Sequence, residues 1–342
     1  MFGFKWQAKV TFHKAVDIYF SIITPLYNSE HFITDAIESV MKQSFPNWEM
    51  IIVDDGSTDN SLAVAEQFAN KDKRIKVAQH ENGQNKGVSA TRNLGIRHSS
   101  YQWLAMLDAD DRWLPDKLEK DAAIITNNKC ALVYSKAEVI DVQGAIINSK
   151  ESKTEIKLNR TPVFGHGPAL IDSFPMAVKE KWGVPTSTVV FFKDAATKYG
   201  FFNETTGDVE DFLLWYQLAE QGNVYFFNKV SAQYRIHISS WNAENSDYKK
   251  LIPRRQKMYH YLLQTVGEEN KSIVSRKLVA EGFKLISRAC LVVPHNDLKL
   301  VMTSLQKIIK DKNIRFRHKA LSFFIFIQEL VLVPIKLLRK FG

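Results

Sequence analysis

The chain contains little cysteine: its 342 residues include Cys130 and Cys290 and no others. Two thiols are too few for a disulfide framework and fit a reducing compartment, where both are most simply ordinary core residues. Residues 1–17 mix lysines with aromatic side chains and contain no uninterrupted apolar stretch, so no signal peptide is predicted. These absences argue against a small secreted scaffold, and we expect a cytoplasmic protein.

Long hydrophobic runs are also missing, although one segment comes close. Residues 321–341 are rich in apolar side chains, but Gln328, Glu329 and Pro334 interrupt them. A membrane-spanning helix needs roughly 18 or more consecutive apolar residues. The segment is therefore predicted not to cross a bilayer.

The same segment has a cationic end, formed by Lys336, Arg339 and Lys340. An amphipathic helix of this kind can lie on the inner leaflet with its lysines near anionic headgroups. Docking on the protein's own domain or on a partner explains the pattern equally well. The sequence thus leaves two alternatives, peripheral contact with the cytoplasmic face of the membrane and a protein contact.

Signatures of nucleic-acid binding are absent in spite of a net charge of +9. The chain has no zinc-ligand spacing, no recognition helix and no basic run interleaved with stacking aromatics. No nucleic-acid partner is expected, and the basic excess is better assigned to phosphate-bearing ligands and membrane contacts. A hydrophobic fraction of 45% supports a buried core in one large domain with a smaller appendage.

What the chain does have is an alternation of strand-like and helix-like segments in its first third. Short β-branched runs alternate with apolar positions at helical spacing, and this pattern predicts a mostly parallel sheet with helices on both faces. The expected strands are 19–24, 49–53, 75–78 and 101–107, with helices after the first and second strands and over 87–97. Ligands of such sheets bind beyond the carboxyl ends of the strands, where Pro25, Asp55 and Asp108 fall.

The pattern changes further along the chain. We expect a hairpin at the sheet edge over 131–147 around Gly144, a surface loop over 148–160, a strand over 184–192, a helix over 211–220 and a strand pair over 224–237. Beyond Trp241 the chain becomes helical and basic. The predicted domains are 17–244, an α/β catalytic domain, and 245–342, a helical C-terminal region with an amphipathic tail.

Acidic residues follow the expected strand at 101–107. Asp108 and Asp110 are two positions apart, so in an extended segment both carboxylates would face one ligand. Hard oxygen donors suit Mg²⁺ or Mn²⁺, which would neutralise the charge on a departing diphosphate. Taken alone, an Asp-x-Asp is more often a helix cap, here of the helix that begins at Pro115.

A second acidic pair follows the strand at 49–53. Asp55 could accept hydrogen bonds from a nucleobase edge, and Tyr27, after the first strand, could stack on that base. Both have simpler explanations. Residues such as Ser57 at a strand-to-helix turn are ordinary helix caps, and an isolated tyrosine is more often part of the core.

The third acidic pair, Glu210 and Asp211, opens an amphipathic helix. The simplest account is a favourable interaction with the helix dipole, which would also keep Asp211 ionised, as a general base must be. One base opposite a diphosphate leaving group predicts a single in-line displacement with inversion at the anomeric carbon.

Further along the chain, Arg235 and His237 share a strand face. Arg235 is expected to be a phosphate or structural contact, and His237 is a possible metal ligand.

Together these residues resemble the family 2 glycosyltransferases, an inverting group with the GT-A fold. The resemblance runs from about residue 20 to residue 237, and six short motifs in the right order carry it. They are Ser-Ile-Ile-Thr-Pro-Leu-Tyr-Asn at 21–28, Ile-Val-Asp-Asp-Gly-Ser-Thr-Asp at 52–59, Asn-Lys-Gly-Val-Ser-Ala-Thr-Arg-Asn-Leu-Gly at 85–95, Leu-Asp-Ala-Asp-Asp at 107–111, Glu-Asp at 210–211 and Tyr-Arg-Ile-His at 234–237.

The resemblance implies roles for the donor side of the site. Pro25, Tyr27 and Asp55 would hold the nucleoside, Arg92 would contact the nucleotide, and Asp108 would reach the ribose or the diphosphate. A UDP-sugar is the favoured donor.

It also implies the reacting groups. Asp110 and His237 would bind the divalent cation, Mn²⁺ or Mg²⁺, Asp211 would be the base, and Glu210 would bind the acceptor. The Gln-x-x-Arg-Trp signature of processive synthases is missing, which favours a single sugar addition. The expected function is transfer of one sugar to a saccharide or lipid-linked saccharide in cell-surface polysaccharide or glycolipid biosynthesis.

Two rival functions follow from the same residues. A nucleotidyltransferase should show a glycine-rich, lysine-bearing phosphate loop after its first strand, and residues 25–28, Pro-Leu-Tyr-Asn, are nothing of that kind. A catalytically silent sugar-nucleotide-binding scaffold at the membrane is the other. The presence of Asp110, Asp211 and His237 counts against it.

Overall fold

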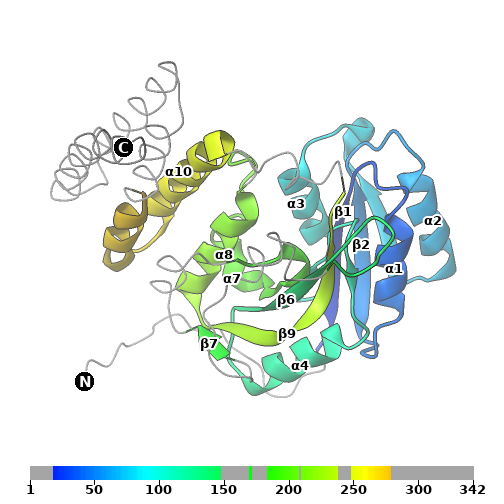
Figure 1. Cartoon of the computed structure of the whole chain (residues 1–342), viewed down its shortest axis with the longest axis horizontal. Coiled ribbons are helices and arrows are strands. Elements are labelled where there is room, and N and C mark those ends of the chain that lie inside the picture. The colour runs from blue at the N-terminus through cyan, green and yellow to red at the C-terminus, as the bar shows by residue number, and fades with distance from the viewer. Residues whose placement is uncertain (1–17, 148–168, 172–182, 208, 238–247, 279–342) are drawn as a thin grey trace, which may run out of the picture.

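The computed structural model describes residues 18–147, 169–171, 183–207, 209–237 and 248–278. Figure 1 shows a central sheet whose N-terminal part carries α1, α2 and α3, with α8 and α10 over its other half. The loop expected over 148–160 and the amphipathic tail at 321–341 lie outside the described residues.

Within the described residues the sheet has nine strands in the order β3-β2-β1-β4-β8-β6-β9-β5, with β7 paired to β9. The strands are β1 (Phe20–Leu26), β2 (Trp48–Asp54), β3 (Ile75–Gln79), β4 (Trp103–Met106), β5 (Arg112–Trp113), β6 (Leu132–Ile140), β7 (Ala169–Ile171), β8 (Val190–Phe192) and β9 (Val224–Arg235). The helices are α1 (Ile33–Met41), α2 (Ser61–Lys71), α3 (Val88–His98), α4 (Lys117–Asn127), α7 (Lys193–Thr197), α8 (Glu210–Gln221) and α10 (Tyr248–Thr265). Short 3-10 turns are η1 (Glu81–Gly83) and η2 (Thr186–Thr188).

The first four strands confirm the expected parallel arrangement. β1 pairs in parallel with β2 and with β4, and β2 pairs in parallel with β3. Every residue of β2 is buried, as expected of a strand covered on both faces. Because these strands run in one direction, their carboxyl ends meet at one edge of the sheet.

The prediction of a hairpin at the sheet edge over 131–147 is wrong. Residues 132–140 form one long strand, β6, inside the sheet between β8 and β9. The antiparallel return is reduced to a single bridge between Ile140 and Ile146, across the turn at Gly144. Seven of the nine residues of β6 are buried, and they lie on both faces of the strand. An interior strand that is covered on both faces requires this burial, whereas an edge strand does not.

Two further strand predictions need correction. The pair expected over 224–237 is the single strand β9, which runs parallel to β6 with register shifts around Lys136. The segment 184–192, expected to be one strand, forms a strand only at Val190–Phe192, because residues 186–188 form the turn η2. The expected helix at 211–220 is confirmed as α8, which begins one residue earlier.

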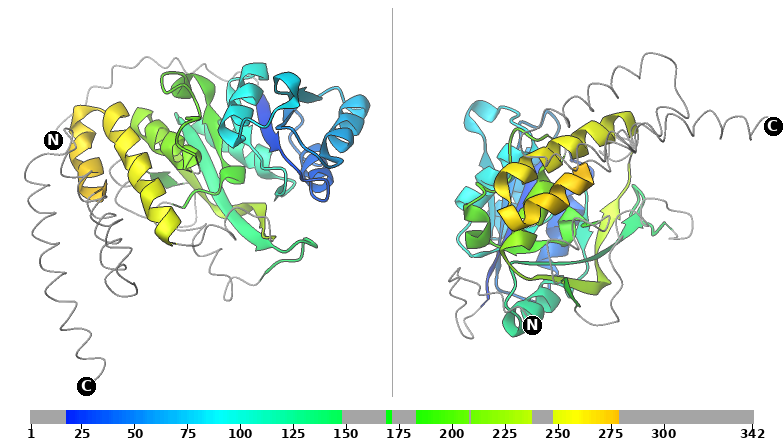
Figure 2. Two further views of the ribbon diagram at one scale, coloured as in Figure 1. Left: turned by 90° about the horizontal axis from the view of Figure 1, so that it is seen from above. Right: turned by 90° about the vertical axis from the view of Figure 1, so that its left-hand side faces the viewer.

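Two hydrophobic cores lie on opposite faces of the sheet. One holds the buried residues of α1, α2 and α4, and the other those of α3, α7 and α8. In Figure 2 the views from above and from the side agree that α10 packs against α8. Its residues Met258, Leu262 and Leu263 are buried in the same core as Trp215 of α8.

The predicted helical region therefore includes a helix, α10, that shares a hydrophobic core with α3, α7 and α8. The division of the chain at 244/245 stays a prediction. Among the described residues, no helix has both the length and the apolarity needed to span a membrane.

A buried carboxylate ties the amino ends of the strands together. Glu49 of β2 accepts hydrogen bonds from Ser21 Oγ at 2.6 Å, from the backbone N–H of Ser100 at 2.6 Å and from Lys76 Nζ at 2.7 Å. Burial raises the pKa of Glu49, but the hydrogen bonds from Lys76, Ser21 and Ser100 outweigh it and leave the pKa below its usual value. The ionised carboxylate is thus part of the folded state.

We expect Glu49→Gln to lower the free energy of unfolding at pH 7 by about 1–3 kcal/mol, since Ser21, Ser100 and Lys76 lose an ionised acceptor. A folded-state pKa below the unfolded value stabilises above pH 4.5, and this stability is lost as the pH falls. The free energy of unfolding should therefore decrease less between pH 7 and pH 4 in the variant than in the unchanged protein. Urea unfolding at pH 7 and pH 4 measures both effects, with the exposed Glu66→Gln as control. Equal stability of the two variants would contradict the expectation.

Candidate active site

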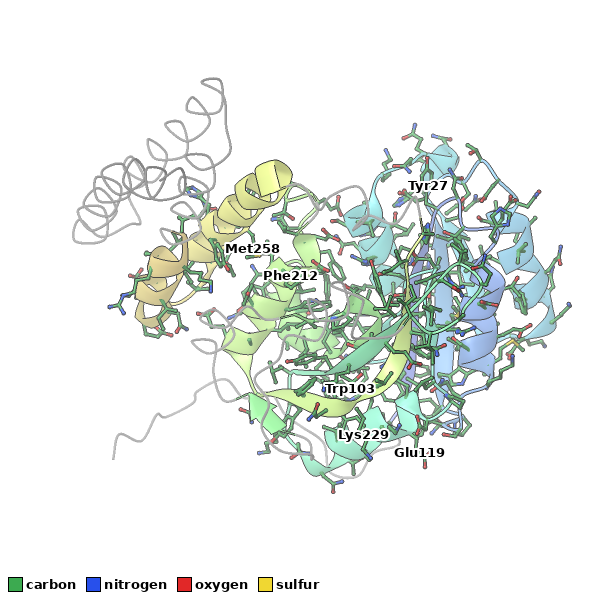
Figure 3. The ribbon with its side chains drawn as sticks, viewed as in Figure 1. Tyr27, Trp103, Glu119, Phe212, Lys229 and Met258 are labelled. Carbon is green, nitrogen blue, oxygen red and sulfur yellow. The ribbon has the colours of Figure 1, made fainter. Side chains whose placement is uncertain are left out.

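The carboxyl ends of β1, β2 and β4 bring the predicted nucleotide-binding residues to one edge of the sheet. Pro25 lies within β1, and Asp55 and Asp108 follow β2 and β4. Figure 3 shows Tyr27 at the upper edge, and Trp103, which begins β4, toward the opposite end. Tyr27 is 50% exposed, so its ring is available for stacking on a base. The alternative that it belongs to the core is excluded.

Asp55 is buried and already bound by the backbone. Its carboxylate accepts hydrogen bonds from the N–H groups of Lys86 at 2.7 Å and Gly87 at 3.0 Å, immediately before α3. The next residue, Gly56, has a φ of +75°, and a Cβ there would lie 2.6 Å from the carbonyl oxygen of Gly83. Asp55 therefore holds the loop before α3 against the end of β2, with carboxylate lone pairs left for a ligand.

Arg92 lies at the centre of the site, on α3, and is 4% exposed. Its guanidinium donates to Asp108 Oδ1 at 2.8 Å and to Glu210 Oε1 at 2.8 Å. Burial by itself would lower the pKa of Arg92, but the carboxylates of Asp108 and Glu210 raise it above its usual value. The structure thus gives Arg92 two carboxylate partners that the sequence did not indicate, and its predicted contact with the nucleotide stays a prediction.

The segment 108–111 is a turn, with the Asp111 N–H bonded to the Asp108 carbonyl oxygen at 3.1 Å. The expectation that an extended backbone aligns Asp108 and Asp110 is therefore wrong, because the strand ends at Met106. Both side chains are nevertheless 28% exposed. Asp111 is buried and accepts hydrogen bonds from Ser187 Oγ at 2.5 Å and the Arg235 N–H at 2.9 Å.

Arg235 secures the same turn from the end of β9. Its Nε donates to the Asp110 carbonyl oxygen at 2.9 Å, and its terminal nitrogens donate to Asp35 at 2.6 Å and to the carbonyl oxygens of Asp141 and Val142. Only 1% of the residue is exposed. Of the two roles that the sequence left open, the structure supports the structural one.

His237 lies beside Asp110, with its Nε2 3.0 Å from Asp110 Oδ2. Phe32, just before α1, packs on the His237 ring at a centroid distance of 4.8 Å. An imidazole nitrogen and a carboxylate oxygen that converge in this way fit a divalent cation that keeps waters and substrate phosphate oxygens as its other ligands. The part of the chain that the structure describes has no group of three or more His, Cys, Asp or Glu residues suited to a metal.

The carboxylates of Glu210 and Asp211 differ in environment. Burial and then the neighbouring Asp211 raise the pKa of Glu210 to about 8, although Arg92 opposes this. Burial also raises the pKa of Asp211, against the lowering effects of Arg92 and a hydrogen bond from Thr186. The expectation that the helix dipole dominates the pKa of Asp211 is therefore wrong, because desolvation of the buried carboxylate outweighs the effect of the dipole. Among the residues that the structure describes, Glu210 Oε2 is buried without a hydrogen-bond partner.

The sequence reasoning missed two residues that contact the predicted site, Thr186 and Ser187 of η2. Thr186 Oγ1 donates to Asp211 Oδ2 at 2.8 Å, and Ser187 Oγ accepts from the Asp108 N–H at 3.1 Å. Their segment has the β-branched composition of a strand and was predicted as one. No local signal separates these hydroxyls from those of an ordinary strand.

Carboxylates gather beyond the parallel strands of a mixed α/β sheet, and the acidic start of α8 faces them across Arg92. This arrangement defines a glycosyltransferase of the GT-A fold. The protein-family model described as glycosyl transferase family 2 matches residues 21–178 of this chain. TuaG of Bacillus subtilis strain 168, named for teichuronic acid biosynthesis, is 30% identical over 256 residues, 72% of this chain and 91% of TuaG. The chain belongs to glycosyltransferase family 2.

A second relative is WfgD of Escherichia coli, named a UDP-Glc:alpha-D-GlcNAc-diphosphoundecaprenol beta-1,3-glucosyltransferase. It is 29% identical over 237 residues, 69% of this chain and 83% of WfgD. Both of these relatives thus match this chain across most of their own length.

Solved structures share the fold. Residues 1–349 of S. aureus TarS, in complex with UDP-GlcNAc, superpose with a TM-score of 0.66 at 19% identity, covering 89% of this chain and 84% of that one. The mannosyltransferase PcManGT of Pyrobaculum calidifontis, with GDP-Man and Mn²⁺, gives 0.55 at 13% identity, covering 93% and 86%. At these identities the likeness supports the GT-A fold.

Proposed function

We propose that this glycosyltransferase is metal-dependent and inverting, and that it moves one sugar from a UDP-sugar to a saccharide or lipid-linked saccharide. The observation that carries the proposal is the position of Arg92, whose guanidinium binds Asp108 and Glu210 at once. One residue thereby joins the turn that would meet the diphosphate to the helix start that bears the base. The donor and acceptor sides of the site share one buried charge cluster.

In the proposed mechanism Asp211 accepts the proton of the attacking acceptor hydroxyl. Burial raises the pKa of both carboxylates, that of Glu210 to about 8, and the hydrogen bond from Thr186 favours the ionised form of Asp211. Glu210 Oε2, which has no partner in the described part of the chain, would bind an acceptor hydroxyl. One base opposite a diphosphate leaving group would give a single displacement with inversion at the anomeric carbon.

The donor side depends on groups that position the nucleotide. Tyr27 stacks on the base, Asp55 binds its edge, and Asp108 reaches the ribose or diphosphate. Asp110 and His237 are the residues that would hold Mn²⁺ or Mg²⁺, and the bound cation would stabilise the negative charge of the diphosphate leaving group. Mn²⁺ accompanies the sugar nucleotide in the PcManGT structure, which supports the choice of metal.

The choice of substrates draws on named relatives. TarS binds UDP-GlcNAc in its structure, and the name of WfgD specifies a UDP-sugar donor and a diphosphoundecaprenol acceptor. By analogy we propose a UDP-sugar donor and a lipid-linked acceptor in cell-surface polysaccharide or glycolipid biosynthesis. A site on the cytoplasmic face of the membrane, with the C-terminal tail in peripheral contact, is part of the same proposal.

A thermal-shift comparison of UDP, GDP, CDP and dTDP, each with and without Mn²⁺, tests the donor class. A ligand at about 100 times its Kd stabilises the folded state by about 2.7 kcal/mol, a shift of roughly 5 °C for a domain of this size. We expect the largest shift with UDP and Mn²⁺ together, and a smaller one in Asp110→Asn. A larger shift with another nucleotide, or one indifferent to Mn²⁺ and to Asp110, would contradict the proposal.

A further inference from the structure

The turn η2 touches both halves of the site through adjacent residues. Ser187, 3% exposed, donates from Oγ to Asp111 Oδ2 at 2.5 Å and accepts the Asp108 N–H at 3.1 Å. Its carbonyl oxygen accepts Trp113 Nε1–H at 2.6 Å. Two of these contacts fix Ser187 against the turn 108–111, which the proposed function places at the diphosphate, and the third fixes it to Trp113 of β5.

Thr186 reaches the other way, toward the base. Its Oγ1 donates to Asp211 Oδ2 at 2.8 Å, while Asp211 Oδ1 accepts the N–H of Phe212 at 2.6 Å. The bond from Phe212 comes from α8 itself and moves with the helix. The bond from Thr186 comes from a different element, so it fixes the carboxylate relative to the turn 108–111.

We propose that Thr186 is a positioning residue for Asp211, and that the peptide unit Thr186–Ser187 sets the base at a fixed distance and angle from the donor-side turn. The inference rests on the proposed function, since it takes Asp211 as the base. Two geometric facts support it: the hydroxyl bonds one carboxylate oxygen and leaves that oxygen a further lone pair, and the neighbouring residue is immobilised by buried contacts.

The same hydrogen bond has an electrostatic consequence. The groups that face Asp211 are Arg92 from α3, Glu210 from its own helix, Asp108 from the turn after β4, and Thr186. A hydroxyl that donates to a carboxylate favours its ionised form and lowers its pKa. Loss of the Thr186 hydroxyl should therefore raise the pKa of Asp211 further, and the base should lose its proton only at higher pH.

The test compares Thr186→Val with Thr188→Val in the full-length chain. Both substitutions remove one hydroxyl from η2, but Thr188 Oγ1 donates only to the Pro185 carbonyl oxygen, at 2.7 Å, among the bonds that the structure describes. We expect Thr186→Val to lower kcat about 10-fold at pH 7 and to move the acidic limb of the kcat profile up by about half a unit to one unit. Thr186→Ser should restore both, and Thr188→Val should change neither.

The UDP and Mn²⁺ thermal shift serves as the second measurement. A shift that is unchanged in Thr186→Val, together with the moved acidic limb, supports a positioning role. A kcat profile equal to that of Thr188→Val overturns the inference, and so does a Thr186→Val protein that loses the nucleotide shift. Failure of the proposed function is a separate result, because it appears as retained turnover in Asp211→Asn whatever Thr186 does.

Discussion

Asp211→Asn is expected to lower kcat by about 10³-fold, since a positioned general base contributes roughly 10²–10⁴-fold and an amide has no proton affinity to replace it. The amide preserves the size of the side chain, and its oxygen can accept the Phe212 N–H while its NH₂ group donates to Thr186 Oγ1. The loss should therefore come from chemistry and not from a displaced helix. Initial rates of sugar transfer at saturating donor and acceptor measure it.

The controls separate the base from the fold and from the donor site. Asp194→Asn changes an exposed carboxylate in the first turn of α7 and should leave kcat unaltered. The UDP and Mn²⁺ thermal shift of Asp211→Asn should match that of the unchanged protein. Turnover within a few-fold of that of the unchanged protein would show that another group takes the proton.

Arg92→Met is expected to destabilise the fold by about 3–5 kcal/mol, the cost of removing one partner from a buried ion pair. The substitution leaves Asp108 and Glu210 facing each other near the centre of the site without the guanidinium that both of them bind. Glu210 should then stay protonated to a higher pH, because the positive charge that lowers its pKa is gone. Urea unfolding at pH 7 measures the loss of stability.

Arg97→Met is the matched control, since Arg97 lies on the same helix α3 and is exposed. Its free energy of unfolding should change by less than about 0.5 kcal/mol. Arg92→Lys retains the charge but lacks the planar fork that reaches both carboxylates, so we expect it to recover only part of the stability. If Arg92→Met were as stable as Arg97→Met, the buried charge cluster would not contribute to the fold in the way described.

The parallel half of the sheet was predictable because its information is local. Strands that are buried on both faces read as continuous β-branched runs, and the helices between them show apolar residues at helical spacing. The end of such a strand is marked by the residues that follow it, so Pro25, Asp55 and Asp108 could be placed at one edge before the structure was known. The roles of these residues as ligands remain predictions.

The strands in the second half of the chain were harder to predict from the sequence, as β6 and β9 show. A run of alternating residues followed by Gly144 predicts a hairpin, yet β6 pairs in parallel with β9, a strand that begins 84 positions after Ile140. The turn at Gly144 does form, but its return strand contributes a single bridge. Partner choice in a sheet depends on which faces other elements cover, and that information does not lie within the strand.

By itself the sequence determined the class of the fold, the strands whose ends carry the acidic motifs and the start of the helix with Glu210 and Asp211. Tertiary structure alone decided that Arg92 joins Asp108 to Glu210, that residues 108–111 form a turn, and that Thr186 contacts Asp211. The physical reason is range. Periodicity and turn chemistry act over a few residues, whereas Arg92 and Thr186 contact residues 16 to 118 positions away. The turn 108–111 is likewise held by the distant residues Ser187 and Arg235, which only packing of the whole sheet brings to it.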